Sequence, residues 1–153
     1  FTEFEALIED LFIGLLTGKL YTNPPVKNPR KLKIVPASST LEVLLNGKPF
    51  LDWLPYEDNT KKRANLFFTD GKPFSKLTDE QIKSLKDYHF VRNALVHKSK
   101  AAHKKFEIII KDLTLLPNEK TPAGYLMSKP QGIATQYQIA VAELGVMVKT
   151  LCS

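Results

Sequence analysis

The chain has 153 residues, of which 43% are hydrophobic and 25% charged, and its formal net charge is +6. A chain of this length buries enough surface for a true core, and its apolar fraction excludes an intrinsically disordered protein. No apolar run approaches the roughly 20 residues that a membrane-spanning helix needs, and the acidic N-terminus lacks the basic start of a secretory signal. We expect one domain over residues 1–153, excised from or flanked by further sequence because it begins with Phe1.

Cysteine content indicates the setting. Cys152 is the only cysteine, so no disulfide forms within one chain. Zinc sites usually take several cysteine or histidine ligands, and a reducing compartment is the ordinary place for a chain without disulfides. We therefore expect a cytoplasmic protein that does not enter the membrane and that needs no cofactor.

Positive charge gathers in three clusters, at residues 27–33, 61–63 and 98–105. Clusters of lysine and arginine attract phosphate backbones, which makes nucleic acid a candidate partner. The alternative is that these residues form solvated faces of helices, as charge runs often do.

The first part of the chain predicts two helices separated by a proline-rich loop. Apolar residues recur at helical spacing over 4–16, and Gly18 follows as a stop. Ser39 and Glu42 form a capping-box pattern before a short second helix, which ends at Asn46-Gly47. The prolines of the loop are Pro24, Pro25, Pro29 and Pro36.

Residues 47–77 combine three prolines with several large apolar side chains. We predict a long loop or short helical turns, pinned to the core by the aromatic rings, because large aromatics mostly serve burial. The alternative is that Trp53 or Phe67 stacks on nucleic-acid bases, since aromatic residues among basic ones do so in some proteins.

The second part of the chain predicts three more helices. Thr78 and Gln81 repeat the capping box and begin a helix that runs to about Lys98. A fourth helix is expected over 102–113, although the β-branched run 108–110 also fits a strand. Residues 117–134 read as a loop, and Thr135 caps a final helix. The predicted fold is all-α, a helical bundle with two long structured loops.

The residues with the clearest chemistry are Arg92-Asn93-x3-His97, late in the third predicted helix. Asn93 and His97 are four residues apart and share a helix face, whereas Arg92 is offset from His97 by about 140°. Histidine both accepts and donates protons near neutral pH, and a guanidinium holds phosphate oxygens through two bonds. Cleavage of RNA by its own 2′-hydroxyl needs these groups and no metal ion.

This pattern resembles the R-x4-6-H motif of the HEPN superfamily, in which the residue after the arginine is often polar, as Asn93 is. The segment 116–126 and the N-terminal Phe1-x2-Phe4-Glu5 are similar to a RiboL-PSP-HEPN-like branch found with defence and RNA-processing genes. The resemblance implies a HEPN-like bundle. It also implies a metal-independent endoribonuclease that acts as a toxin or phage-defence effector, with an antitoxin or a regulatory domain as a further partner.

The resemblance also implies a homodimer in which two motif helices meet at a two-fold axis and form one composite site. The catalytic residues it implies are Arg92, Asn93 and His97 of both subunits, which would leave a 2′,3′-cyclic phosphate on the RNA. The residues expected to bind RNA are Lys98, Lys100, Lys104 and Lys105.

Several alternatives stay open. In one alternative, Arg92 is an ion-pair partner of Asp87 and His97 is an ordinary histidine at a helix C-terminus. A second alternative is a non-catalytic HEPN module for RNA binding or dimerisation, and a third is a helical domain with no nucleic-acid role, although the intact Arg92-Asn93-x3-His97 motif favours the ribonuclease. No carboxylate pair with metal spacing accompanies His89 and His97, so we predict no metal site. Ser99 stands where HEPN toxins silenced by adenylylation carry Tyr, which disfavours that regulation.

Overall fold

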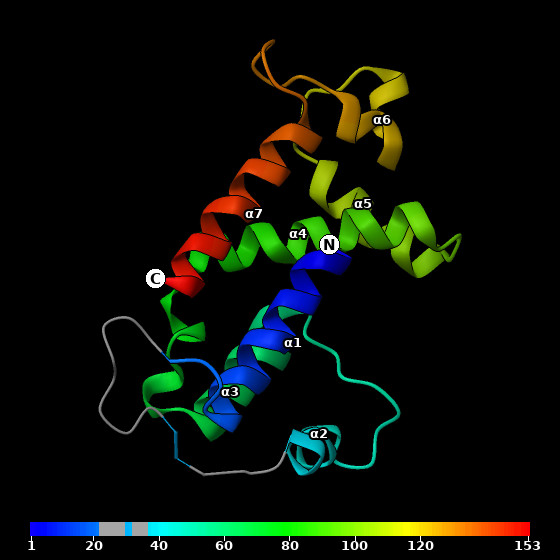
Figure 1. Ribbon diagram of the computed structural model, residues 1–153. Coiled ribbons are helices and arrows are strands. Elements are labelled where there is room, and N and C mark those ends of the chain that lie inside the picture. Colours follow the sequence, from blue (N-terminus) through cyan, green and yellow to red (C-terminus); the bar gives the residue numbers. More distant parts are fainter. Residues whose placement is uncertain (22–29, 32–36) are drawn as a thin grey trace. The chain divides into compact units, whose positions relative to one another are not determined.

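The structure is a computed structural model that describes residues 1–21, 30–31 and 37–153. These residues form seven α-helices with short 3-10 and π-helical turns and no strand, which confirms the predicted all-α fold (Figure 1). Within the same residues no helix is both long and apolar enough to cross a bilayer. The predicted proline-rich loop and most of the basic cluster 27–33 lie outside the described residues.

The backbone contacts divide the chain into two compact units. One consists of residues 1–82 and 147–153, and the other of residues 83–146. The predicted motif and the lysines that follow it all belong to the second unit. The single domain over residues 1–153 stays a prediction.

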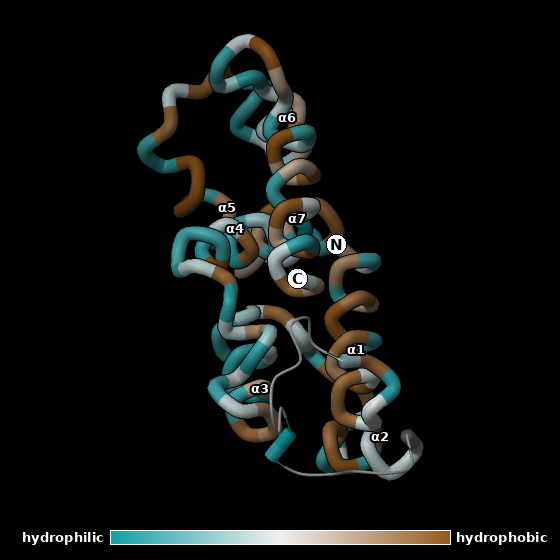
Figure 2. Tube along the Cα trace, turned by 60° about the vertical axis from the view of Figure 1, so that its left-hand side comes forward, coloured by the Kyte–Doolittle hydropathy of each residue, from teal (hydrophilic) through white to brown (hydrophobic). Residues whose placement is uncertain are grey.

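Helix α1, Thr2–Thr17, buries one apolar face. Its hydrophobic residues recur along the tube in Figure 2, as the helical spacing predicted. The helix ends at Gly18, whose φ of 74° and ψ of 20° are left-handed, a conformation that glycine adopts without steric cost. The predicted stop is confirmed.

Helix α2, Ala37–Leu45, begins two residues before the predicted cap, so Ser39 lies inside the helix and the predicted capping box is wrong. An N-cap residue stands before the first helical residue, whereas Ser39 follows the helical residues Ala37 and Ser38. Its predicted end is confirmed, because Asn46 and Gly47 have φ angles of 45° and 78°.

Short helical turns follow α2. Of the two structures predicted for residues 47–77, a long loop or short helical turns, the second is therefore observed. A π-helical turn, Glu57–Lys61, leads into α3, Lys62–Phe67, and two 3-10 turns follow at Thr69–Gly71 and Phe74–Lys76. Ring-to-ring contacts tie this segment to α1, because the centroid of Phe12 lies 5.1 Å from that of Trp53 and 4.9 Å from that of Phe68.

Trp53 is not a base-stacking residue. Only 2% of it is exposed, and its indole Nε1 donates a hydrogen bond of 2.9 Å to Oε2 of Glu9. Phe67 is half-buried, and its ring centroid lies 6.1 Å from that of Phe12. Both rings therefore serve the core, and the nucleic-acid alternative for this segment is wrong for Trp53.

The capping box predicted at Thr78 and the cap predicted at Thr135 are confirmed. Thr78 Oγ1 accepts from Gln81 N at 3.2 Å while Gln81 Oε1 accepts from Thr78 N at 3.0 Å, and α4, Asp79–Val96, begins there. α4 ends two residues short of the predicted Lys98. Thr135 and Gln138 exchange the same pair of bonds at the start of α7, Gln136–Cys152.

Between these helices the predicted fourth helix is confirmed, with different bounds, and the predicted loop is corrected. Helix α5, Lys100–Ile110, includes the β-branched run, so that run is helical, and Ser99 Oγ caps the helix by accepting from Ala102 N at 3.2 Å. The expected loop 117–134 contains a 3-10 turn, Pro117–Lys120, and α6, Pro122–Met127. Pro117 and Pro122 each stand in the first turn of a helix, where proline is favoured, so these two prolines do not mark a loop.

The core of the second unit sets the rotation of α4 about its axis. Val91 and Ala94 are buried against Phe106 of α5 and Tyr125 of α6. The rings of Phe106 and Tyr125 meet edge to face with centroids 5.8 Å apart. Because Val91 and Ala94 point into this core, the residues between them on the helix are turned toward its surface.

Candidate functional site

The motif lies at the C-terminal end of α4. Arg92 and Asn93 are half-buried, and His97 is exposed directly after the last helical residue. The backbone N–H of His97 still donates to the carbonyl oxygen of Asn93 at 2.8 Å, so helical geometry extends to the histidine. Local helix structure therefore keeps these two residues one turn apart, as the sequence predicted.

Hydrogen bonds join three side chains of α4 in a row. Arg92 Nη1 donates to Asn93 Oδ1 at 3.1 Å, and Asn93 Nδ2 lies 2.9 Å from His89 Nε2. A guanidinium has no acceptor, so the amide must turn its oxygen toward Arg92 and its NH2 toward His89. With the amide in this orientation, His89 Nε2 is the acceptor of the bond from Asn93 Nδ2.

A pocket of about 200 Å³ opens between α4 and α5 beside this row. It brings Asn93, His97 and Lys105 together, whereas Arg92 is connected to it only through Asn93. Among the residues that the structure describes, none forms a hydrogen bond to the His97 imidazole, so this ring remains available to an incoming molecule. The remaining lining residues are Phe90, Ser99, Ala101 and Ala102.

Phe90 is a site residue that the sequence reasoning missed. It is half-buried, and two lysines form cation–π contacts with its ring. Lys105 Nζ lies 4.8 Å and Lys86 Nζ 5.8 Å from the ring centroid. The sequence spacing indicates this position, because Phe90, Asn93 and His97 stand at i, i+3 and i+7 and therefore share one helix face.

The predicted RNA-binding lysines are all exposed. Lys98 lies in the link between the helices, and the other three are on α5, where only Lys105 lines the pocket. The four residues are Lys98, Lys100, Lys104 and Lys105.

The basic cluster 61–63 has a different environment. Lys61 and Lys62 form ion pairs of 3.1 Å and 2.7 Å with Glu57 and Asp58, and Arg63 lies 4.7 Å over the ring of Trp53. By contrast, no ion pair of the described residues involves the cluster 98–105. The cluster on α5 therefore has more positive charge left for an anionic ligand.

The alternative ion pair between Arg92 and Asp87 is not formed among the described side chains, where Arg92 donates to Asn93. Burial raises the pKa of Asp87, and the nearby Lys83 and Lys86 partly offset the shift. On the next position, burial and a hydrogen bond of 2.7 Å to Glu143 raise the pKa of Tyr88. Both acidic groups belong to the packing of α4.

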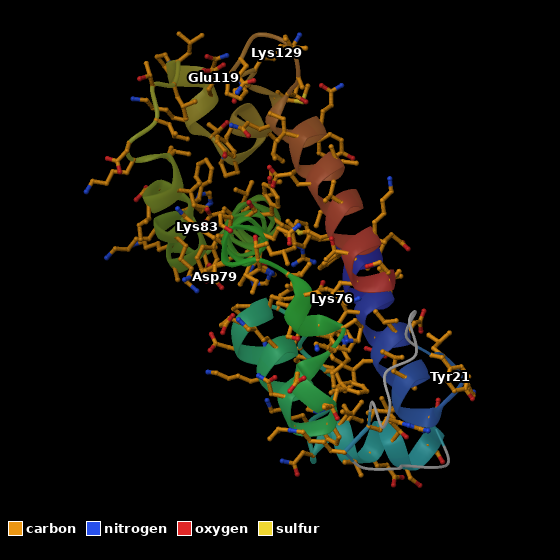
Figure 3. All side chains as sticks on the ribbon, turned by 90° about the vertical axis from the view of Figure 1, so that its left-hand side faces the viewer. Tyr21, Lys76, Asp79, Lys83, Glu119 and Lys129 are labelled. Atoms are coloured by element: carbon orange, nitrogen blue, oxygen red, sulfur yellow. The ribbon has the colours of Figure 1, made fainter. Side chains whose placement is uncertain are left out.

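A second pocket of the same unit, of about 300 Å³, lies near Glu119 and Lys129, which Figure 3 labels. Glu119 Oε2 accepts from the backbone N–H of Leu116 at 2.9 Å, so this carboxylate stabilises a local turn. The lining contains neither histidine nor arginine. The pocket beside His97 is therefore the better candidate for proton-transfer chemistry.

No three histidine, cysteine, aspartate or glutamate side chains come together to hold a metal ion in residues 1–21, 30–31 and 37–153. Comparison of the chain with family models, with curated proteins and with solved structures gave no match.

Proposed function

We propose that the chain is a metal-independent endoribonuclease of the HEPN type, which works as a homodimer with a composite arginine and histidine site. The observation that carries the proposal is the end of α4, where Arg92 is fixed by Asn93 next to the pocket that contains His97. The lysine-rich helix α5 forms the other wall of that pocket. Arg92 offers an RNA phosphate a cation, His97 offers a proton-transfer group, and the lysines of α5 offer further positive charge.

These groups supply each need of RNA cleavage by transesterification. The neutral imidazole of His97 takes the proton from a 2′-hydroxyl, whose oxygen then attacks the adjacent phosphorus. The Arg92 guanidinium stabilises the charge on the phosphorane oxygens. The bond from phosphorus to the 5′-oxygen breaks, and that oxygen takes up a proton from the imidazolium of the second subunit. The products are a 2′,3′-cyclic phosphate and a free 5′-hydroxyl.

A dimer at the end of α4 is supported by apolar exposure beside the motif. Leu95 is 45% and Val96 is 59% exposed, although both are large hydrophobic residues next to His97. A two-fold contact would bury the same residues of both chains and bring a second Arg92 and His97 to the site.

A ribonuclease of this kind harms its own cell unless it is restrained. We therefore propose that it acts in the cytoplasm as a toxin or phage-defence effector, with RNA as substrate and an antitoxin or regulatory domain as its inhibitor. The lone Cys152 fits a reducing compartment.

Cleavage of end-labelled single-stranded RNA by the purified chain in the presence of a chelator tests the proposal. We expect product with a 2′,3′-cyclic phosphate end, identified by mass spectrometry. Loss of cleavage in chelator that a divalent ion restores would overturn the metal-independent mechanism. Tight RNA binding with no cleavage would favour the alternative, a non-catalytic HEPN module.

A further inference from the structure

We infer that His89 is a positioning residue of this site, which holds Asn93 and, through Asn93, the guanidinium of Arg92. Its catalytic role rests on the proposed function, whereas the hydrogen bonds that define the role are testable without RNA. The inference follows from the row of bonds at 3.1 Å and 2.9 Å along α4.

His89 acts through Asn93 and not on the ligand. It is half-buried and is not among the residues that line the pocket beside His97. Asn93 does line the pocket, but its oxygen and its NH2 group are both engaged by neighbouring side chains. The amide of Asn93 is therefore a link that transmits the position of His89 to Arg92.

Arginine needs such a link more than other residues do. Its side chain is long and rotates about several bonds, so a half-exposed guanidinium samples many positions unless a hydrogen bond selects one. Helical spacing places His89 four residues before Asn93, where the two side chains meet on one face. The row thus stabilises one orientation of Arg92 before the phosphate arrives, which is how a charged group lowers a transition-state barrier efficiently.

Only one protonation state of His89 is compatible with the row. If Nε2 carried a proton, it would face the NH2 group of Asn93, and two donors would oppose each other. The Asn93 amide would then turn over and present its NH2 group to Arg92. The Arg92 guanidinium is also a donor, so no bond between them would form. The bond from Arg92 survives only when His89 is neutral with its proton on Nδ1.

Nitrogen-15 NMR of the histidine side chains tests this arrangement in the intact chain without RNA. We expect His89 to show the tautomer protonated on Nδ1 near neutral pH. In Asn93→Asp the carboxylate has no hydrogen to donate, so the His89 proton should appear on Nε2. A parent protein in which His89 is protonated on Nε2, or on both nitrogens, contradicts the inference.

Two amide substitutions of different length test the catalytic role. In His89→Gln the side-chain Oε1 is as many bonds from Cβ as Nε2 is in histidine, so it accepts from Asn93 in the same place. In His89→Asn the amide is one methylene shorter and does not reach. We expect His89→Asn to lower the single-turnover rate at saturating RNA by about 10²-fold with unchanged RNA affinity, and His89→Gln to retain most of the rate.

The outcomes separate this inference from the proposed function. A parent that cleaves RNA, with His89→Asn equally fast, removes the role of His89 and leaves the ribonuclease intact. A His89→Gln variant as slow as His89→Asn, with the same melting temperature as the parent, also overturns the inference. A parent that binds but does not cleave RNA refutes the proposed function, and the catalytic role of His89 with it.

Discussion

At the scale of single residues, substitution of His97 should change the rate of the proposed cleavage without changing the stability of the fold. Its side chain is exposed and forms no hydrogen bond with the described residues, so His97→Ala should leave the melting temperature unchanged. Loss of the proton-transfer group should slow cleavage by about 10²–10⁴-fold. Single-turnover cleavage at saturating RNA, with thermal melting beside it, measures both. A variant that cleaves like the parent would refute the ribonuclease; one that unfolds would make His97 structural.

Arg92 should behave like His97 in the same assay. Arg92→Ala removes the charge at the phosphorane and should cost a comparable factor. Arg92→Lys should rescue little, because an ammonium group does not make the bidentate contact of a guanidinium. Arg63→Lys is the matched control, because Arg63 stacks over Trp53 in the other compact unit. This variant should cleave as the parent does.

At the scale of the helix, α5 is predicted to contribute affinity through its charge. Lys104→Ala should weaken RNA binding and reduce the slope of log affinity against log salt concentration by about 1, because one phosphate contact is lost. The single-turnover rate at saturating RNA should stay close to that of the parent. Binding titrations at several salt concentrations measure the slope.

The matched control for α5 is Lys129→Ala. Lys129 is equally exposed and belongs to the same compact unit, but it lines the pocket near Glu119 and not the one beside His97. Its substitution changes the net charge by the same amount. An equal loss of RNA affinity in both variants would show that net charge alone, and not the position of α5, determines binding.

The first turn of α4 is predicted to depend on its capping box. Thr78→Ala removes the oxygen that accepts from Gln81 N and should lower the free energy of unfolding by about 1 kcal/mol. Chemical denaturation monitored by circular dichroism measures the change. Thr114→Ala is the control, because Thr114 is an exposed threonine outside the helices. Equal stability of Thr78→Ala and the control would contradict the role of the cap.

At the scale of the whole molecule, we predict a homodimer, with a mass by light scattering twice the 17.3 kDa of the chain. Val96→Lys places a charge at the proposed interface and should yield a monomer that has lost cleavage. Ile133→Lys makes the same change at a residue that is 85% exposed elsewhere and should stay dimeric. A parent that is monomeric at micromolar concentration and still cleaves RNA would refute the composite site.

Much of the helical structure is determined by the sequence alone, because its signals are local. The box of Thr78 with Gln81 and that of Thr135 with Gln138 join residues three positions apart, and both helices begin where predicted. The Arg92-Asn93-x3-His97 spacing likewise places Asn93 and His97 one turn apart before any tertiary contact forms. Gly18 ends α1 because a left-handed residue stops a helix regardless of its surroundings.

Tertiary structure alone decided which residues face the pocket and which charges remain unpaired. The hydrogen bond between Trp53 and Glu9 spans 44 positions, and no local pattern indicates it. Burial of Val91 and Ala94 against Phe106 rotates α4 so that Asn93 reaches the surface. Contacts of this kind depend on shape and burial summed over distant segments, whereas caps and spacing depend on a few neighbouring residues.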